Sequence, residues 1–376
     1  MKKIFFILIL ILIFAIHGHA SEVESDIISS IDSELCDFEK SLPEYVKEFL
    51  PKELFSGDFS SLTDGEVNQA SFMEYTINYL LSSLPDILKG FSSLLILILI
   101  ISIFNVIKSS FSSDGMKNAF SICSTLCVSV SVFSFLSTVV DLSIDYINAL
   151  CGTMNTFAPL MSGLYIMTGS ITSAAVSNAS MMLFLSIVEN FITVGLVPIV
   201  KICICFSIVG SISSSTDLSG ISKLIKNTFT GTCAFIMSIF SFVMSYQSVL
   251  SQGVDSLSLR TARFAIGNFI PIVGGFVSDS LKTISSSLSY VKSSCGVIAI
   301  IAIVIITLPI IISLFLYRLS FSLIGGVSKA LGIENECKIF DEATSICSFV
   351  LAIIALSVVV FIFAITIFIK SSVMVS

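Results

Sequence analysis

The sequence predicts an all-α, polytopic membrane protein: a helical bundle of about seven spans with a small acidic helical head outside the cytoplasm. Mean hydropathy is +1.02, and 55% of the 376 residues are hydrophobic whereas only 12% are charged. Soluble domains carry about 25% charged residues. The charge is also uneven, because Ser21–Lys89 holds 15 acidic residues against four lysines. The composition therefore predicts a lipid bilayer as the surroundings and gives no basic face for nucleic acid.

Residues 1–20 have the pattern of a signal peptide. Lys2 and Lys3 form a positive start, Ile4–Ile16 is apolar, and Gly18-His19-Ala20 is a small-x-small cleavage site. The alternative is an uncleaved anchor helix. Either interpretation starts residue 21 outside the cytoplasm.

Residues 21–85 form the predicted head. Apolar residues recur at helical spacing around Ile28–Phe38 and again over Glu66–Leu84, and Pro43 and Pro51 interrupt the pattern. Two or three short helices are expected, in a segment too small for a strong core of its own. Its acidic residues are those of a solvated surface or of a docking surface for a basic partner.

Residues 86–376 form the predicted transmembrane domain, because apolar runs of about 20 residues suffice to cross a bilayer. The seven expected spans are Ile87–Ile107, Ala119–Val140, Phe157–Ser177, Met181–Ser211, Phe229–Leu250, Val297–Tyr317 and Ser345–Ile369. Counting lysine and arginine in the loops then places the N-terminus outside and the C-terminus in the cytoplasm. The loop holding Lys223 and Lys226 falls outside in this scheme, which counts against it. Merging or splitting the runs between Phe157 and Ser211 is the alternative, which changes the count by one and reverses the side of every later segment.

Leu257–Ser280 is apolar but broken, and it is too short to be an eighth span. We expect a re-entrant or interfacial broken helix on the cytoplasmic side, acting as a gate or coupling segment; an oligomer contact is the alternative. The candidate residues are Arg260, Arg263, Gly267, Asn268, Pro271, Gly274, Gly275 and Asp279.

Three polar residues interrupt the fourth predicted span: Glu189, Asn190 and Lys201. Such residues are costly in lipid and usually face a bundle interior or a cavity. A proton or cation relay through Glu189 is one interpretation, and a structural hydrogen bond or an interface position is the other. The many serines of the spans fit either close helix packing or a wet lining.

The mature chain lacks the residues of common catalytic and metal sites. His17 and His19 are the only histidines, both precede the cleavage site, and the ten cysteines form no CxxC pair. We therefore expect no enzyme activity, no metal and no cofactor. A nucleotide-binding loop of the GxxxxGK[ST] type is also absent.

Leu259–Asp279, LRTARFAIGNFIPIVGGFVSD, closely resembles the stage III sporulation protein AE family of endospore-forming bacteria. The Gly/Ser-rich stretch at residues 169–180, the run VKSSCGVIAIIAIVI, the last span and the leader with its acidic head follow in the family order. The resemblance covers essentially the whole chain.

That resemblance implies a multi-pass protein of the mother-cell membrane around the forespore, within a sporulation channel or secretion-like complex. Its implied partners are other proteins of the same operon, including a cytoplasmic ATPase, and indirectly a forespore membrane protein. The chain would be a permease- or export-gate-like core needed for forespore development. The alternatives are a non-conducting scaffold for channel assembly and an ion- or proton-coupled transporter.

Overall fold

The computed structural model describes residues 33–48, 69–108, 113–212, 218–269 and 274–370. Within these ranges the chain is helical and has no strand. The signal peptide that we predict at residues 1–20 lies outside them. The helices are a first one at residues 33–41, then α2 (Glu44–Lys47), α3 (Gln69–Lys108), α4 (Asp114–Met167), α5 (Ile171–Ile212), α6 (Ser219–Phe269), α7 (Gly274–Ala330) and α8 (Glu334–Lys370).

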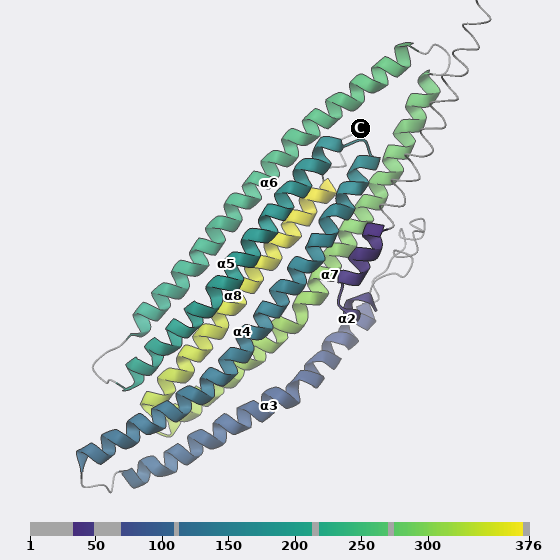
Figure 1. Cartoon of the computed structure of the whole chain (residues 1–376). Helices are drawn as coiled ribbons and strands as arrows, with labels where there is room; N and C mark the ends of the chain where they lie inside the picture. Colours follow the sequence, from purple (N-terminus) through teal and green to yellow (C-terminus); the bar gives the residue numbers. More distant parts are fainter. Residues whose placement is uncertain (1–32, 49–68, 109–112, 213–217, 270–273, 371–376) are drawn as a thin grey trace, which may run out of the picture.

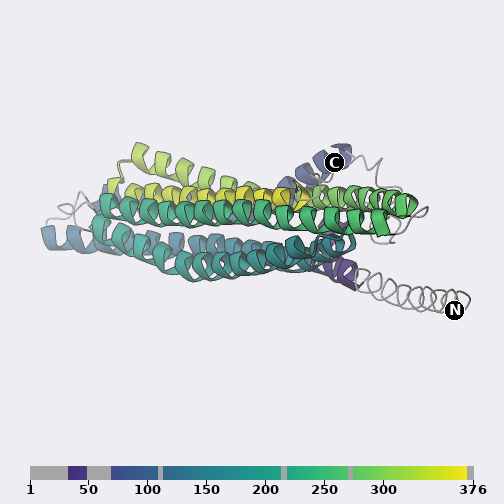
Figure 2. The same cartoon turned by 90° about the horizontal axis from the view of Figure 1, so that it is seen from above.

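The six helices from α3 to α8 form one elongated bundle in which successive helices run in opposite directions (Figures 1 and 2). Each of the six is long and apolar enough to cross a membrane. Helix α8 is central, because it packs on α4, α5, α6 and α7. With 37–57 residues each, these helices run to roughly 55–85 Å, well beyond a hydrocarbon core of about 30 Å.

The third predicted span, Phe157–Ser177, is not a separate helix, so the prediction of seven spans is wrong at this point. Helix α4 continues to Met167, the chain turns at Thr168–Ser170, and α5 begins at Ile171. Gly169 has φ +80°, a left-handed conformation that glycine adopts at little cost. The apolar character of the first half of this run reflects burial within the protein. Its residues Phe157, Leu160, Met161 and Leu164 each expose at most 2% of their surface.

Six helices place the two ends of the transmembrane domain at the same end of the bundle, which corrects the expected opposite placement. The Phe157 ring lies 5.7 Å from Phe38 of the head and 6.4 Å from Phe368 near the end of α8. We call this the head end, and the opposite end the far end. Lys223 and Lys226 now lie near the far end, on the side where α3 ends at Lys108 and α4 begins before Lys117 (Figure 1). Arg260, Arg263 and Lys370 move to the head end, so the basic residues are divided between the two ends and do not by themselves set the orientation.

The described part of the head packs on the bundle. Leu35, Phe38, Leu42 and Val46 are buried in the same hydrophobic core as the long helices, and the Ser41 and Thr156 hydroxyls lie 2.7 Å apart. Pro43 separates the helix at residues 33–41 from α2, as predicted. A segment of this size gains its stability from the larger core. Helix α3 runs on from the head side through Pro85 into the first predicted span.

The broken segment Leu257–Ser280 is the meeting point of two long helices, not a short re-entrant element. Helix α6 reaches Phe269 and α7 starts at Gly274, so Gly267 and Asn268 are helical. Glycine costs a helix only about 1 kcal/mol, which is why the glycines did not end α6. The segment lies at the head end (Figure 1). A leader that places the head outside the cytoplasm places this segment outside too, contrary to our expectation.

Candidate functional site

Side-chain contacts show that the apolar runs of four helices lie at one level of the bundle. The Phe184 ring of α5 lies 4.2 Å from Phe240 of α6 and 5.3 Å from Phe361 of α8. The Tyr146 hydroxyl of α4 lies 3.1 Å from the hydroxyl of Thr307, in the middle of the apolar run of α7. The middle of α4 also lines one small cavity together with α5 and α8. It is therefore at the depth at which α5, α7 and α8 are most apolar.

At this depth α4 presents four polar side chains and a glycine on its outer surface. Exposed positions follow one another at intervals of four and three residues, which keeps them on one side of a helix. They are Asp141, Asp145, Asn148, Gly152 and Asn155. The predicted spans Ala119–Val140 and Phe157–Ser177 leave Asp141 and Asp145 in a loop between them; this is wrong, since both are inside α4. Helices α3 and α5 flank α4 and make no extended contact with each other, so this surface opens between them.

Helix α5 adds Ser186, Glu189 and Asn190, all exposed. The Asn190 amide donates a hydrogen bond to the Ser186 carbonyl oxygen at 2.8 Å, and Glu189 is an electrostatic neighbour of Cys151 in α4. We call the eight exposed positions of these two helices the polar face: Asp141, Asp145, Asn148, Gly152 and Asn155 of α4 with Ser186, Glu189 and Asn190 of α5. We expected Glu189 and Asn190 to face the bundle interior or a cavity. Instead they face a surface that the described residues leave open.

The side of the bundle formed by α6 has the opposite character. Phe235, Phe242, Tyr246 and Val249 are each 59–72% exposed, at the level of the Phe240 contact. Helices α6 and α3 do not pack on one another and lie at opposite edges of the bundle in Figure 1. The surface of α6 suits lipid, whereas the polar face does not.

The other predicted site residues do not join the polar face. Lys201 is exposed on α5, eleven residues farther along than Asn190. Arg260 is exposed near the end of α6 at the head end. Gly267, Asn268, Gly274, Gly275 and Asp279 are helical at that same end, and Arg263 is in α6. Pro271 lies outside the described residues, as do the side chains of Arg263 and of residues 265–280.

Sequence reasoning missed Asn148, Gly152 and Asn155. Their spacing from Asp141 was a readable signal, but it was hidden once the two aspartates were assigned to a loop between spans. Among the described residues, no group of three His, Cys, Asp or Glu could hold a metal ion.

Comparison with known proteins identifies the group to which this architecture belongs. The sequence model of the stage III sporulation protein AE family matches residues 55–372, most of the chain. The chain belongs to the stage III sporulation protein AE family. The stage III sporulation protein AE of Bacillus subtilis (strain 168) is 22% identical to it over 358 residues, which cover 94% of this chain and 87% of that protein. No solved structure matches the chain.

Membership of the stage III sporulation protein AE family confirms the resemblance that the sequence predicted and gives the chain a role in sporulation. The matched residues include all six long helices and the whole polar face.

Proposed function

We propose that this protein is a membrane component of a sporulation channel or secretion-like complex between mother cell and forespore, and that its polar face borders a water-filled path. The polar face at membrane depth is the observation that carries the proposal. A charged side chain at the centre of a lipid-facing helix costs about 2.5–3.5 kcal/mol on insertion scales. Water or another subunit must therefore cover Asp141, Asp145 and Glu189.

The charge of the polar face favours water and cations over an apolar partner. Its three charged residues are all acidic, and two such faces brought together would repel each other. Rings of acidic side chains are the usual lining of cation-conducting paths. A path of this kind needs several subunits around it, which agrees with the other proteins of the operon being the partners that we propose.

An ATPase partner would approach the far end in this arrangement. The leader predicts that the head is extracytoplasmic, and the far end is the opposite end of the bundle. The chain itself has no phosphate-binding loop. We therefore place the coupling surface at the far-end loops and not at Leu257–Ser280.

Cysteine accessibility tests the path. In a variant whose native cysteines are replaced, single cysteines at Asn148, Gly152 and Asn155 should react with a membrane-impermeant maleimide in sporulating cells. Cysteines at the buried neighbours Ile147 and Leu150 should stay protected, because they face the core. A cysteine at Phe242 is the lipid-facing control. Labelling of the polar face only after detergent extraction would favour the non-conducting scaffold, since another protein would then cover it.

Replacement of Glu189 separates a hydrated lining from a proton-coupled transporter. We expect Glu189→Gln to sporulate at wild-type frequency, because glutamine keeps the surface polar and a lining needs no titration there. Glu189→Leu should impair sporulation by removing the polar group, and Lys201→Gln, on the same helix, is the matched control. Loss of sporulation in Glu189→Gln at normal protein level would contradict this view and favour the transporter.

A further inference from the structure

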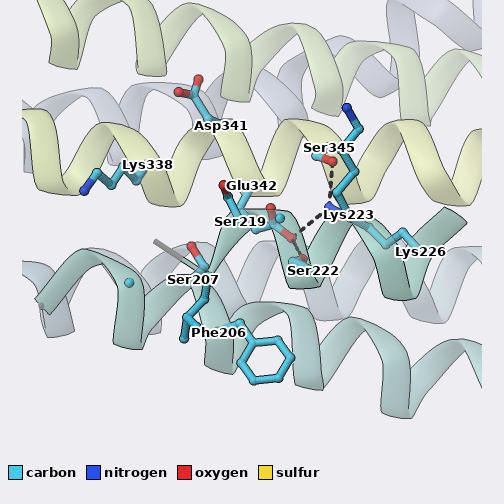
Figure 3. Close-up of a pocket in the computed structure, with 13 residues that line it drawn as sticks. Phe206, Ser207, Ser219, Ser222, Lys223, Lys226, Lys338, Asp341, Glu342 and Ser345 are labelled. Carbon is cyan, nitrogen blue, oxygen red and sulfur yellow. Dashed lines mark hydrogen bonds and ion pairs between the residues drawn. The ribbon is translucent and has the colours of Figure 1, made fainter. Parts of the chain in front are cut away.

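A pocket of about 400 Å³ opens at the far end between α5, α6 and α8. Three lysines line it, Lys223 and Lys226 from α6 and Lys338 from α8, against the two acidic residues Asp341 and Glu342. Figure 3 shows these side chains around the cavity, with Lys226 directed at Glu342 and Ser345. The pocket is separate from the polar face, and none of our predicted site residues lines it.

The acidic groups of the pocket already have partners. Lys226 lies 2.8 Å from Glu342, with only 5% and 12% of their side chains exposed, and the Ser222 hydroxyl also donates to Glu342. Asp341 pairs with Lys329 at 3.7 Å. Among the described residues, no ion pair includes Lys223 or Lys338. Lys223 and Lys338 are therefore available to a ligand at the rim, and the side chains that line the pocket carry one net positive charge.

One buried polar atom of the pocket also lacks a partner. The hydroxyl oxygen of Ser207 is covered and makes no hydrogen bond within the described structure, and Ser207 is one of the lining residues. A buried hydroxyl without a partner costs about 1–3 kcal/mol. An oxygen-rich ligand in the pocket would satisfy it.

The pocket lies at the depth of lipid headgroups. The apolar run of α6 begins at Phe229, three residues after Lys226, and that of α8 begins at Ser345, three residues after Glu342. Beyond this level exposed apolar residues continue toward the head end, Ile202 on α5 and Phe235 and Ile239 on α6. A cationic pocket thus adjoins a surface suited to acyl chains.

We infer that this pocket binds the phosphate group of an anionic phospholipid. Lys223 and Lys338 supply the charge, Ser207 donates a hydrogen bond, and the Lys226–Glu342 pair holds α6 and α8 in place around the ligand. Basic pockets between transmembrane helices bind anionic headgroups in this way. Free phosphate has the same chemistry and is the other source that the test must distinguish. The inference goes beyond the proposed function and does not depend on it.

The test uses the full chain in nanodiscs of phosphatidylcholine with a minor fraction of phosphatidylglycerol, and native mass spectrometry counts the retained lipids. Wild-type protein should retain phosphatidylglycerol in preference to phosphatidylcholine. The double variant Lys223→Gln/Lys338→Gln should bind it roughly 30-fold more weakly, from about 1 kcal/mol for each lysine. The charge-matched control is Lys89→Gln/Lys117→Gln, two lysines outside the pocket of which the first is exposed and the second half-buried. Both variants should keep wild-type helicity, because none of the four side chains is buried.

Retention of phosphatidylglycerol by Lys223→Gln/Lys338→Gln as in the wild type would overturn the inference. So would equal loss in the control variant, since the effect would then be general charge. A competition arm adds millimolar inorganic phosphate: undiminished phosphatidylglycerol binding supports the headgroup, and displacement by phosphate alone overturns the lipid as the ligand in favour of a soluble phosphate compound.

Discussion

Replacing Lys226 with methionine should lower the free energy of unfolding by about 3–5 kcal/mol, because it leaves the carboxylate of Glu342 buried without its counter-ion. The two groups lie 2.8 Å apart and join α6 to α8. Ser345 accepts a further hydrogen bond from the same ammonium group at 2.6 Å. The measurement is the unfolding midpoint of the full chain in nanodiscs.

The matched control is Lys329→Met, which removes an exposed pair. Lys329 and Asp341 are 3.7 Å apart with side chains 70% and 61% exposed, so its loss should cost less than about 1 kcal/mol. The double variant Lys226→Met/Glu342→Leu should regain much of the stability, since neither charge then remains buried. Equal unfolding midpoints for Lys226→Met and Lys329→Met would contradict the view that the buried Lys226–Glu342 pair stabilises the fold more than the exposed Lys329–Asp341 pair.

Replacing Asp255 with alanine should be the second most damaging change, with a loss of about 2–4 kcal/mol for two hydrogen bonds to a buried charge. Asp255 belongs to α6, but its carboxylate accepts the backbone N–H groups of Thr172 and Ser173 at 3.0 and 2.8 Å. These are among the first N–H groups of α5, which have no partner within their own helix. Asp255 therefore caps α5 from the neighbouring helix.

Hydrogen exchange gives this prediction a local readout. The amides of Thr172 and Ser173 should exchange faster in Asp255→Ala than in the wild type. In Asp255→Asn their exchange rates should be intermediate, because one side-chain acceptor oxygen remains. Asp86→Ala is the control, since Asp86 is exposed on α3. Unchanged protection at Thr172 and Ser173 in Asp255→Ala would show that another group caps α5.

Much of the architecture was predictable because it depends on composition along the chain. The apolar runs around Ile87–Ile107, Phe229–Leu250, Val297–Tyr317 and Ser345–Ile369 each lie within one long helix of the structure. Pro43 likewise separated two head helices as expected. These features are set by local hydrophobicity and backbone chemistry, which a sequence displays directly.

The number of spans was not predictable in the same way. An apolar run shows that a segment is shielded from water, but it does not show whether lipid or protein shields it. Phe157–Ser177 is as apolar as a span, yet protein covers its first half and its middle is a turn. Counting that run as a helix moved every later loop to the wrong end of the bundle, including Leu257–Ser280.

By itself, the sequence determined that the chain is helical, that it belongs in a membrane, and that Glu189 and Asn190 are polar residues among apolar ones. Only the tertiary structure decided which surface of the bundle these two residues face and which residues of other helices lie next to them. Asn148, Gly152 and Asn155 join Glu189 because α4 and α5 pack together, and Asp255 reaches α5 from 82 residues along the chain. Contacts between distant segments depend on how whole helices pack, and no local pattern of residues encodes that packing.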